Sequence, residues 1–397
     1  MTREREANSR AMDVDTLVIH GGPGPDPATG AVMPPIHPSS TFVRQRIDDD
    51  AKYRYSRGAS PTRDALEGLL ATLEHGVEAS AFASGMAAVN ATMQLLASGD
   101  HVIVGYDCYL TTYDIFANDL PRYGIESSLV DLTDIEAVQA AVRPNTRMVY
   151  IESPTNPLLD VVDLVAMAEI GRASGAITVV DNTFASPYCQ NPIDFGIDLV
   201  VHSTTKYLGG HSDLLGGAVI SRTPELAAQI RACQYNQGAV PSAFDCWLLI
   251  RGIRTLGVRM RQHMVNAQAV AEWLEAQPEV TRVLYPGLAS HRGHDLASRQ
   301  MRGGYSGMVS FEVEGGSSAA RRVSEHTRIF QLATSLGGIE SLIFPPTAWL
   351  ETAPDLMAEI PGSPWAQYPG MLRLSVGIES TRDLIDDLDR ALAALRE

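Results

Sequence analysis

One lysine follows a segment that is typical of a buried strand. Lys206 comes after the apolar run Leu199–Val201, in the segment VVHSTTKYLGGH, with hydroxyl residues before it and a glycine pair after it. A lysine at a strand end beside another cation or an apolar wall has a lowered pKa, and it therefore forms a Schiff base readily. The hydroxyls of Ser203 and Thr205 can donate hydrogen bonds to a phosphate group. Taken alone, the same lysine is equally consistent with a surface position in a loop.

An acid ends another apolar run, about 25 residues before that lysine. Asp181 follows Ile177–Val180 in the segment ITVVDNTF. Open α/β sheets bind ligands at the carboxyl ends of their strands. A carboxylate there can keep a pyridine nitrogen protonated, so that the ring accepts electrons from a carbanion. A helix N-cap is the alternative role for this aspartate, but the acid and the lysine together are more specific than either alone.

Small residues precede a predicted helix in the segment AFASGMAA. Gly85 and Met86 would there present free backbone N–H groups to a phosphate, helped by the helix dipole. Small residues also serve helix packing, so this signal is weak by itself.

Short apolar runs alternate with amphipathic stretches through the first two thirds of the chain. This β-α-β order predicts a mainly parallel sheet with helices on both faces. The expected strands are 101–104, 148–151, 177–180 and 199–201, and the expected helices between them are 134–142 and 164–174.

The rest of the chain has a different pattern. Residues 13 to about 60 are rich in Gly, Pro, Asp and Ser, and so long an irregular segment usually has a function, such as wrapping a neighbour. Further helical patterns cover 62–74, 243–277, 317–326 and 381–395, and strand-like runs cover 307–313 and 373–376. We predict an N-terminal arm (1–60) that contacts a neighbouring subunit, a large α/β domain (61–260) and a smaller α+β C-terminal domain (261–397).

The composition limits which classes of function are possible. Among 397 residues, 45% are hydrophobic and 20% charged, and the net charge of −16 argues against nucleic acid or an acidic membrane as a partner. Four scattered cysteines predict neither disulfides nor a metal site. Residues 1–12 are polar and charged, unlike a secretory signal, and no apolar run is long enough to span a membrane. We expect a cytoplasmic protein that acts on a small molecule.

Several motifs together resemble the cystathionine γ-synthase/γ-lyase family of pyridoxal-5′-phosphate (PLP) enzymes, the Cys/Met-metabolism group of fold type I. The resemblance covers residues 15 to 395. It rests on YSRGASPTR (55–63), ASGMAAV (83–89), DCY (107–109), ESPTNPLLDVVD (152–163), VVDNTF (179–184), HSTTKYLGGHSD (202–213), SLGGIESL (335–342) and RLSVGIE (373–379).

The resemblance implies a fold with a seven-stranded sheet, PLP as the cofactor, and a role for each matching residue. Lys206 would form the Schiff base, Asp181 would pair with the pyridine nitrogen, and Tyr109 would stack on the ring and serve as an acid or base. The residues implied to bind the cofactor or the substrate are Gly85, Met86, Ser203 and Thr205 at the phosphate, Thr183 at the cofactor, Tyr55 and Arg57 at the phosphate of a neighbouring subunit, and Arg373, Ser335 and Asn156 at the substrate carboxylate. The subunit contact implies a homo-oligomer, a tetramer built as a dimer of dimers. For Arg373 a structural ion pair is the alternative.

The sequence departs from the family around the distal part of the substrate site. Members that handle cystathionine resemble A-E-S-L-G-G where this chain has Thr334 before Ser335. Leu110-Thr111 replace a glycine-containing pair, and Phe344, Pro345 and Trp349 stand in a segment that usually carries histidines. Harmless drift in loops is one explanation, and an altered substrate pocket is the other.

We therefore expect a PLP-dependent lyase that catalyses γ-elimination, or γ-replacement, on an L-amino acid other than cystathionine, with a small or uncharged leaving group. The alternative is an ordinary cystathionine γ-synthase or γ-lyase. An aminotransferase fits the surroundings of Tyr109 less well. A binding protein without lyase activity is disfavoured because Lys206, Tyr109 and Arg373 are all kept.

Overall fold

A computed structural model describes residues 12–347 and 367–396. Its larger sheet has seven strands in the order β1-β7-β6-β5-β4-β2-β3. Five neighbouring strands are parallel, and β7 is antiparallel to both β6 and β1. The strands are β1 (Glu78–Phe82), β2 (His101–Gly105), β3 (Glu126–Val130), β4 (Thr146–Glu152), β5 (Ile177–Asp181), β6 (Leu199–Ser203) and β7 (Gly217–Ser221). The predicted mainly parallel sheet is confirmed.

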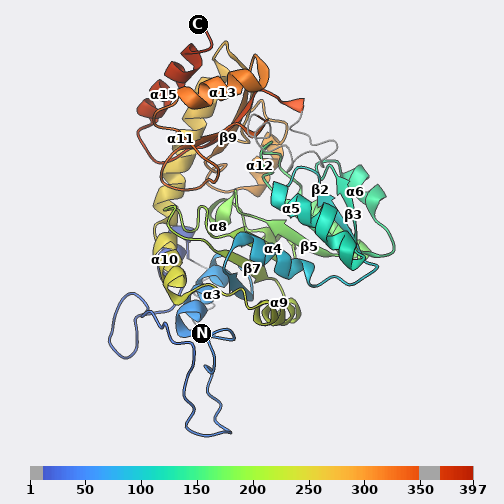
Figure 1. The fold of residues 1–397 in the computed structure, drawn as a ribbon, viewed down its shortest axis with the longest axis vertical. Coiled ribbons are helices and arrows are strands. Elements are labelled where there is room, and N and C mark those ends of the chain that lie inside the picture. The colour runs from blue at the N-terminus through green and yellow to red at the C-terminus, as the bar shows by residue number, and fades with distance from the viewer. Residues whose placement is uncertain (1–11, 348–366, 397) are drawn as a thin grey trace.

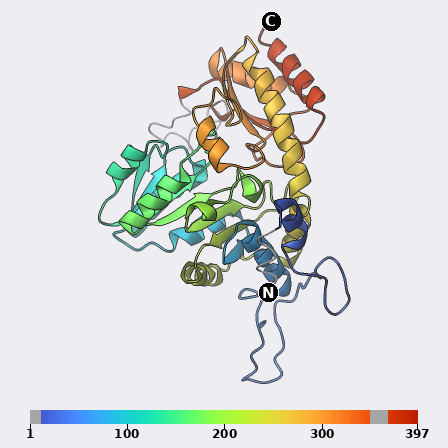
Figure 2. The same ribbon diagram turned by 180° about the vertical axis from the view of Figure 1, so that it is seen from behind.

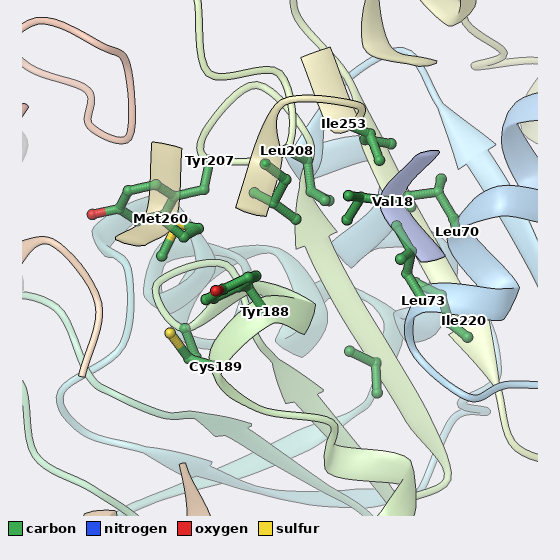
Figure 3. Close-up of a cluster of buried hydrophobic side chains, with 14 of the residues drawn as sticks. Val18, Leu70, Leu73, Tyr188, Cys189, Tyr207, Leu208, Ile220, Ile253 and Met260 are labelled. Atoms are coloured by element: carbon green, nitrogen blue, oxygen red, sulfur yellow. The ribbon is translucent and has the colours of Figure 1, made fainter. Parts of the chain in front are cut away.

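Helices cover both faces of this sheet because successive side chains of each buried strand point to opposite sides. Val179 packs with α4 (Gly85–Met93) and α9 (Pro224–Gln237), whereas Val180 packs with α6 (Ile135–Ala141) and α7 (Leu164–Ser174). Near β7 a third cluster joins α2 (Val14–His20), α3 (Pro61–Leu73), α8 (Ser186–Cys189) and α10 (Ala243–Ile253) (Figure 3). Figure 3 shows Val18, Leu70 and Ile220 converging there.

The smaller sheet has five strands in the order β10-β11-β12-β9-β8. They are β8 (Val280–Leu284), β9 (Met308–Val313), β10 (Gln331–Leu332), β11 (Leu342–Phe344) and β12 (Met371–Ser375), with β10 parallel to β11 and the other pairs antiparallel. Helices α13 (Gly316–His326) and α15 (Thr381–Ala393) contribute to its core, whereas α12 (His294–Gln300) adds Ala297 to the core near β7. The α+β character expected for this part is confirmed.

One long helix joins the two parts. In α11 (Leu256–Glu275), Met260 belongs to the core of the large sheet and Val270 to the core of the small one. The helix runs along one side of the molecule between the two sheets (Figure 1). The boundary expected near residue 260 falls inside α11, and the division into three domains stays a prediction.

Two expectations differ from the structure. The helical pattern over 243–277 is interrupted after α10, because Thr255 has a non-helical backbone and its hydroxyl donates to the Gly252 carbonyl. Residues 13–60 are not wholly irregular, since α2 begins after the capping side chain of Asp13 and packs beside α11 (Figure 2). The rest of that arm extends as loops at the end of the molecule opposite the C-terminus (Figures 1 and 2).

Across 12–347 and 367–396, no helix has the length and apolarity that a membrane crossing requires.

Candidate active site

A cavity of about 610 Å³ lies between the carboxyl ends of the parallel strands and the smaller sheet. Every predicted site residue except Tyr55 and Arg57 lines it. Those residues are Gly85, Met86, Tyr109, Asn156, Asp181, Thr183, Ser203, Thr205, Lys206, Thr334, Ser335 and Arg373.

Lys206 lies in the turn after β6. Its backbone N–H donates to the Ser203 carbonyl, and its own carbonyl accepts from Gly210, so the turn fixes the direction of the side chain. Its Nζ is 2.8 Å from the hydroxyl oxygen of Ser335. Burial, and to a smaller extent the charge of Arg373, lowers the pKa of Lys206 from 10.5 to about 8. The amine is therefore a much better nucleophile near neutral pH than an ordinary lysine.

Asp181 ends β5 and is not a helix cap, because the next helix, α8, begins at Ser186. One of its carboxylate oxygens accepts from the Thr183 N–H over 3.0 Å. The Thr183 hydroxyl accepts from the Ser203 N–H over 2.8 Å, which ties the ends of β5 and β6 together. Burial raises the pKa of Asp181. A cation brought beside it would favour the ionised form, as pairing with a pyridinium requires.

The start of α4 faces the end of β6. Ser84 caps the helix by accepting from Ala87, and the first N–H groups of a helix have no partner within it. A Cβ on Gly85 would lie 2.8 Å from that of Ser203, so this close approach requires glycine. The result is a cradle of backbone donors and the Ser203 side chain. Thr205 also lines the cavity, and its hydroxyl bonds both the N–H and the carbonyl of Gly216.

Arg373 projects from β12 and is almost wholly buried. Its two terminal nitrogens each donate over 2.9 Å, one to the Asn156 side chain and one to the Ser335 carbonyl. Neither partner is an acid, and no ion pair of Arg373 occurs within the described segments, which excludes the structural ion pair there. Burial lowers its pKa to about 10, so it still carries its charge at neutral pH. An unpaired buried guanidinium favours an incoming carboxylate.

Ser335 connects the amine and the guanidinium. Its hydroxyl oxygen is hydrogen-bonded to Nζ of Lys206, and its carbonyl accepts a hydrogen bond from Arg373. Its φ of 89° lies in a region that non-glycine residues rarely adopt. Such strain is typical of residues that a site holds in place.

Tyr109 is half exposed at the cavity, just before α5 (Leu110–Asp114). Its backbone N–H donates over 2.9 Å to the carboxylate of Glu152, a cavity residue to which the sequence analysis gave no role. Burial, and next the charge of Asp181, raises the pKa of Glu152. The sequence pattern that identified Asp181, an acid at the end of a parallel strand, also describes Glu152. In the sheet, Glu152 of β4 pairs directly with Asp181 of β5.

Much of the remaining cavity lining is apolar, and this apolar lining includes Leu110, Leu215, Phe344 and Pro346. The Phe344 ring lies next to Arg373, with its centroid 5.2 Å from the Cζ. Pro345 is not among the lining residues, and Trp349 lies outside the described residues. The described lining has four charged residues, Glu152, Asp181, Lys206 and Arg373. Each of them belongs to one of the groups of contacts described above.

Tyr55 and Arg57 lie away from this chain's own cavity. Arg57 instead contacts Tyr235 at the end of α9, with its Cζ 4.2 Å from the centre of the ring. Within the described residues no group of three or more His, Cys, Asp or Glu side chains is arranged to hold a metal.

These features fit PLP. The helix start and Ser203 suit its phosphate, Asp181 suits its pyridine nitrogen, and Lys206 suits its aldehyde carbon. The fold and the cavity together define a PLP-dependent enzyme of fold type I.

The chain belongs to the Cys/Met metabolism PLP-dependent enzyme family, whose model matches residues 15–393. It is 45% identical over 394 residues to the cystathionine gamma-synthase of Mycobacterium tuberculosis H37Rv, covering 99% of this chain and 100% of that protein. It is 44% identical over 384 residues to the cystathionine gamma-lyase of Bacillus subtilis, covering 96% and 99%. The crystal structure of metB from Corynebacterium glutamicum superposes with a TM-score of 0.93 at 40% identity, covering 98% of this chain and 99% of that one. The predicted family, fold and cofactor are confirmed.

Proposed function

We propose that this enzyme catalyses substitution or elimination at Cγ of an L-amino acid, with Lys206 and Arg373 as the central groups. The observation that carries the proposal is their arrangement around Ser335, which bonds both of them. A nucleophilic amine and a carboxylate-binding guanidinium thus contact the same residue in one cavity, which suits the binding of an α-amino acid.

Each residue then has a defined task. PLP, when bound, supplies the electron sink that stabilises a carbanion. Arg373 and Asn156 would hold the substrate carboxylate. Lys206 would remove the α-proton and, after passing that proton on, would remove one from Cβ, so that the leaving group can depart from Cγ. Asp181 would keep the pyridine nitrogen protonated. Tyr109 would lie beside the PLP ring and could protonate a leaving group at Cγ.

The first candidate reaction forms or cleaves cystathionine. It is supported by relatives called cystathionine gamma-synthase and cystathionine gamma-lyase that share 44–45% identity over nearly the whole chain. It leaves open whether the leaving group is replaced or eliminated.

The second candidate uses a compact substrate with an uncharged leaving group. It is supported by the apolar lining, because the described lining carries no charge beyond the four residues named above that could meet a second zwitterionic end. Removing such an end from water against Leu110 and Leu215 would cost free energy without a compensating contact.

A kinetic comparison distinguishes the two. We would measure kcat/KM for cystathionine, O-acetylhomoserine and a γ-chloro amino acid in the wild type and in Thr334→Glu, with Thr334→Val as the uncharged control. The first candidate expects cystathionine, or its formation, to be best in the wild type. The second expects cystathionine to improve roughly tenfold to a hundredfold in Thr334→Glu alone, as a charged contact is gained.

Assembly completes the site. The position of Arg57 outside its own cavity is consistent with a role at a neighbour's cofactor, in a tetramer made of two dimers. Mixing Arg57→Ala with Lys206→Ala protein should then restore some activity, because one kind of hybrid site carries neither change. We also place the enzyme in the cytoplasm, which suits its four free cysteines.

A further inference from the structure

The guanidinium of Arg57 lies against the ring of Tyr235, in the last turn of α9. Its Cζ is 4.2 Å from the ring centroid, and its Nη1 donates to the Tyr235 carbonyl over 2.9 Å. Carbonyls in the last turn of a helix lack partners within it, and the helix dipole favours a cation there. The ring of Tyr55 is also near, 5.7 Å from the same Cζ.

The backbone beneath Arg57 is held separately. Arg63, 1% exposed, reaches from α3 and donates to the carbonyls of Ser56 and Arg57 over 2.6 and 3.3 Å. A Cβ on Gly58 would lie 3.4 Å from the edge of the Tyr235 ring, so the chain passes close to it. Arg63 therefore fixes the main chain, and Tyr235 fixes the side chain.

Stacking leaves most of the donors of Arg57 free for another ligand. A guanidinium carries five N–H groups in one plane, and the Tyr235 carbonyl takes one of them. The ring meets the face of the cation, so it takes none. A long side chain that is ordered in advance loses less freedom when it binds an anion.

We propose that Tyr235 is a positioning residue for Arg57, which it holds ready for the phosphate of PLP in the neighbouring subunit. This inference rests on the proposed role of Arg57. Tyr235 belongs to none of the sequence motifs, and it is not among the residues that line the cavity.

The test compares PLP with pyridoxal, which lacks the phosphate but reacts with the same lysine. Dissociation constants of both would be measured on the assembled protein by absorbance titration. The variants are Tyr235→Phe, Tyr235→Leu, Arg57→Ala and the double variant Tyr235→Leu/Arg57→Ala. Tyr123→Leu, at a tyrosine that is 70% exposed, is the control. Light scattering checks assembly, and Tyr235→Met replaces the leucine variant if that variant does not assemble.

We expect Tyr235→Leu to weaken PLP about fivefold to thirtyfold and to leave pyridoxal unchanged. Tyr235→Phe should behave as the wild type because it keeps the ring face. In the Arg57→Ala background, removing the ring should have no further effect.

Four outcomes would overturn the inference. Equal weakening of PLP and pyridoxal would show a general structural role, and a full effect of Tyr235→Leu without Arg57 would show that the two do not act together. Selective loss of PLP in Arg57→Ala but not in Tyr235→Leu would refute the role of Tyr235 alone. If Arg57→Ala itself binds both ligands normally, the proposed role of Arg57 fails, and the inference fails with it.

Discussion

The lowered pKa of Lys206 can be tested directly on the apoprotein. The difference between about 8 and the ordinary 10.5 raises the neutral fraction at pH 7 from about three in ten thousand to about one tenth. Two causes act, burial first and the charge of Arg373 second. Arg373→Gln removes only the second, so it should recover less than half of that difference. Asn156→Ala changes a partner of Arg373 but no charge, and it is the matched control.

The sequence makes this assay unusually clean, because the chain has only two lysines, Lys52 and Lys206. The apoprotein would be labelled with a trace of acetic anhydride at a series of pH values, and the two peptides compared by mass spectrometry. Lys52 donates a hydrogen bond to the Asp64 carboxylate, which raises the pKa of Lys52, so its amine should lose its proton at higher pH and label later. If Lys206 and Lys52 label with the same pH midpoint, burial does not act on Lys206 as argued. If Arg373→Gln restores the ordinary value completely, the order of the two causes is wrong.

Three further changes have defined outcomes. Asp181→Asn keeps an acceptor for the Thr183 N–H but cannot carry a negative charge, so kcat should fall on the order of a hundredfold or more while the protein stays folded by circular dichroism. Glu152→Ala leaves the Tyr109 N–H without its acceptor and should lower the free energy of unfolding in urea by about 1–3 kcal/mol, whereas Glu152→Gln should lose much less. Arg373→Lys loses the planar pair of donors, and kcat/KM should fall roughly tenfold to a hundredfold, mainly through KM.

Much of the cofactor end could be predicted because local rules dictate it. A short run such as Ile177–Val180 within a β-α-β pattern is typical of a buried strand in a parallel sheet, and the residue after it then lies at the carboxyl edge. Asp181 and Lys206 follow two such runs, and β5 and β6 prove to be neighbours in the sheet. Their convergence on one cavity follows from that placement.

The features that escaped prediction depend on contacts between distant segments. The antiparallel direction of β7 is set by its two neighbours and not by its own apolar sequence. Glu152 acquires its importance from the Tyr109 N–H, 43 residues away. Tyr235 and Arg57 are 178 residues apart, and nothing in either local sequence points to the other. The break after α10 was equally hidden, because Thr255 interrupts the helix through its own hydroxyl without disturbing the apolar pattern.

The distribution of charge along the cavity bears on substrate selection. Asp181, Lys206 and Arg373 are engaged by the proposed cofactor and carboxylate contacts, and Glu152 accepts from the Tyr109 N–H, so selection beyond Cβ depends on the shape and desolvation of the apolar lining. An apolar pocket discriminates against one methylene group by only about 1–3 kcal/mol. Selectivity among uncharged leaving groups should therefore be modest, about tenfold to two-hundredfold in kcat/KM. A charged distal group is penalised more strongly unless a polar partner replaces water, and Thr334 offers only one hydroxyl. Thr334 directly precedes Ser335, which contacts both Lys206 and Arg373. A carboxylate introduced at position 334 would therefore give a charged distal group a partner close to the catalytic residues.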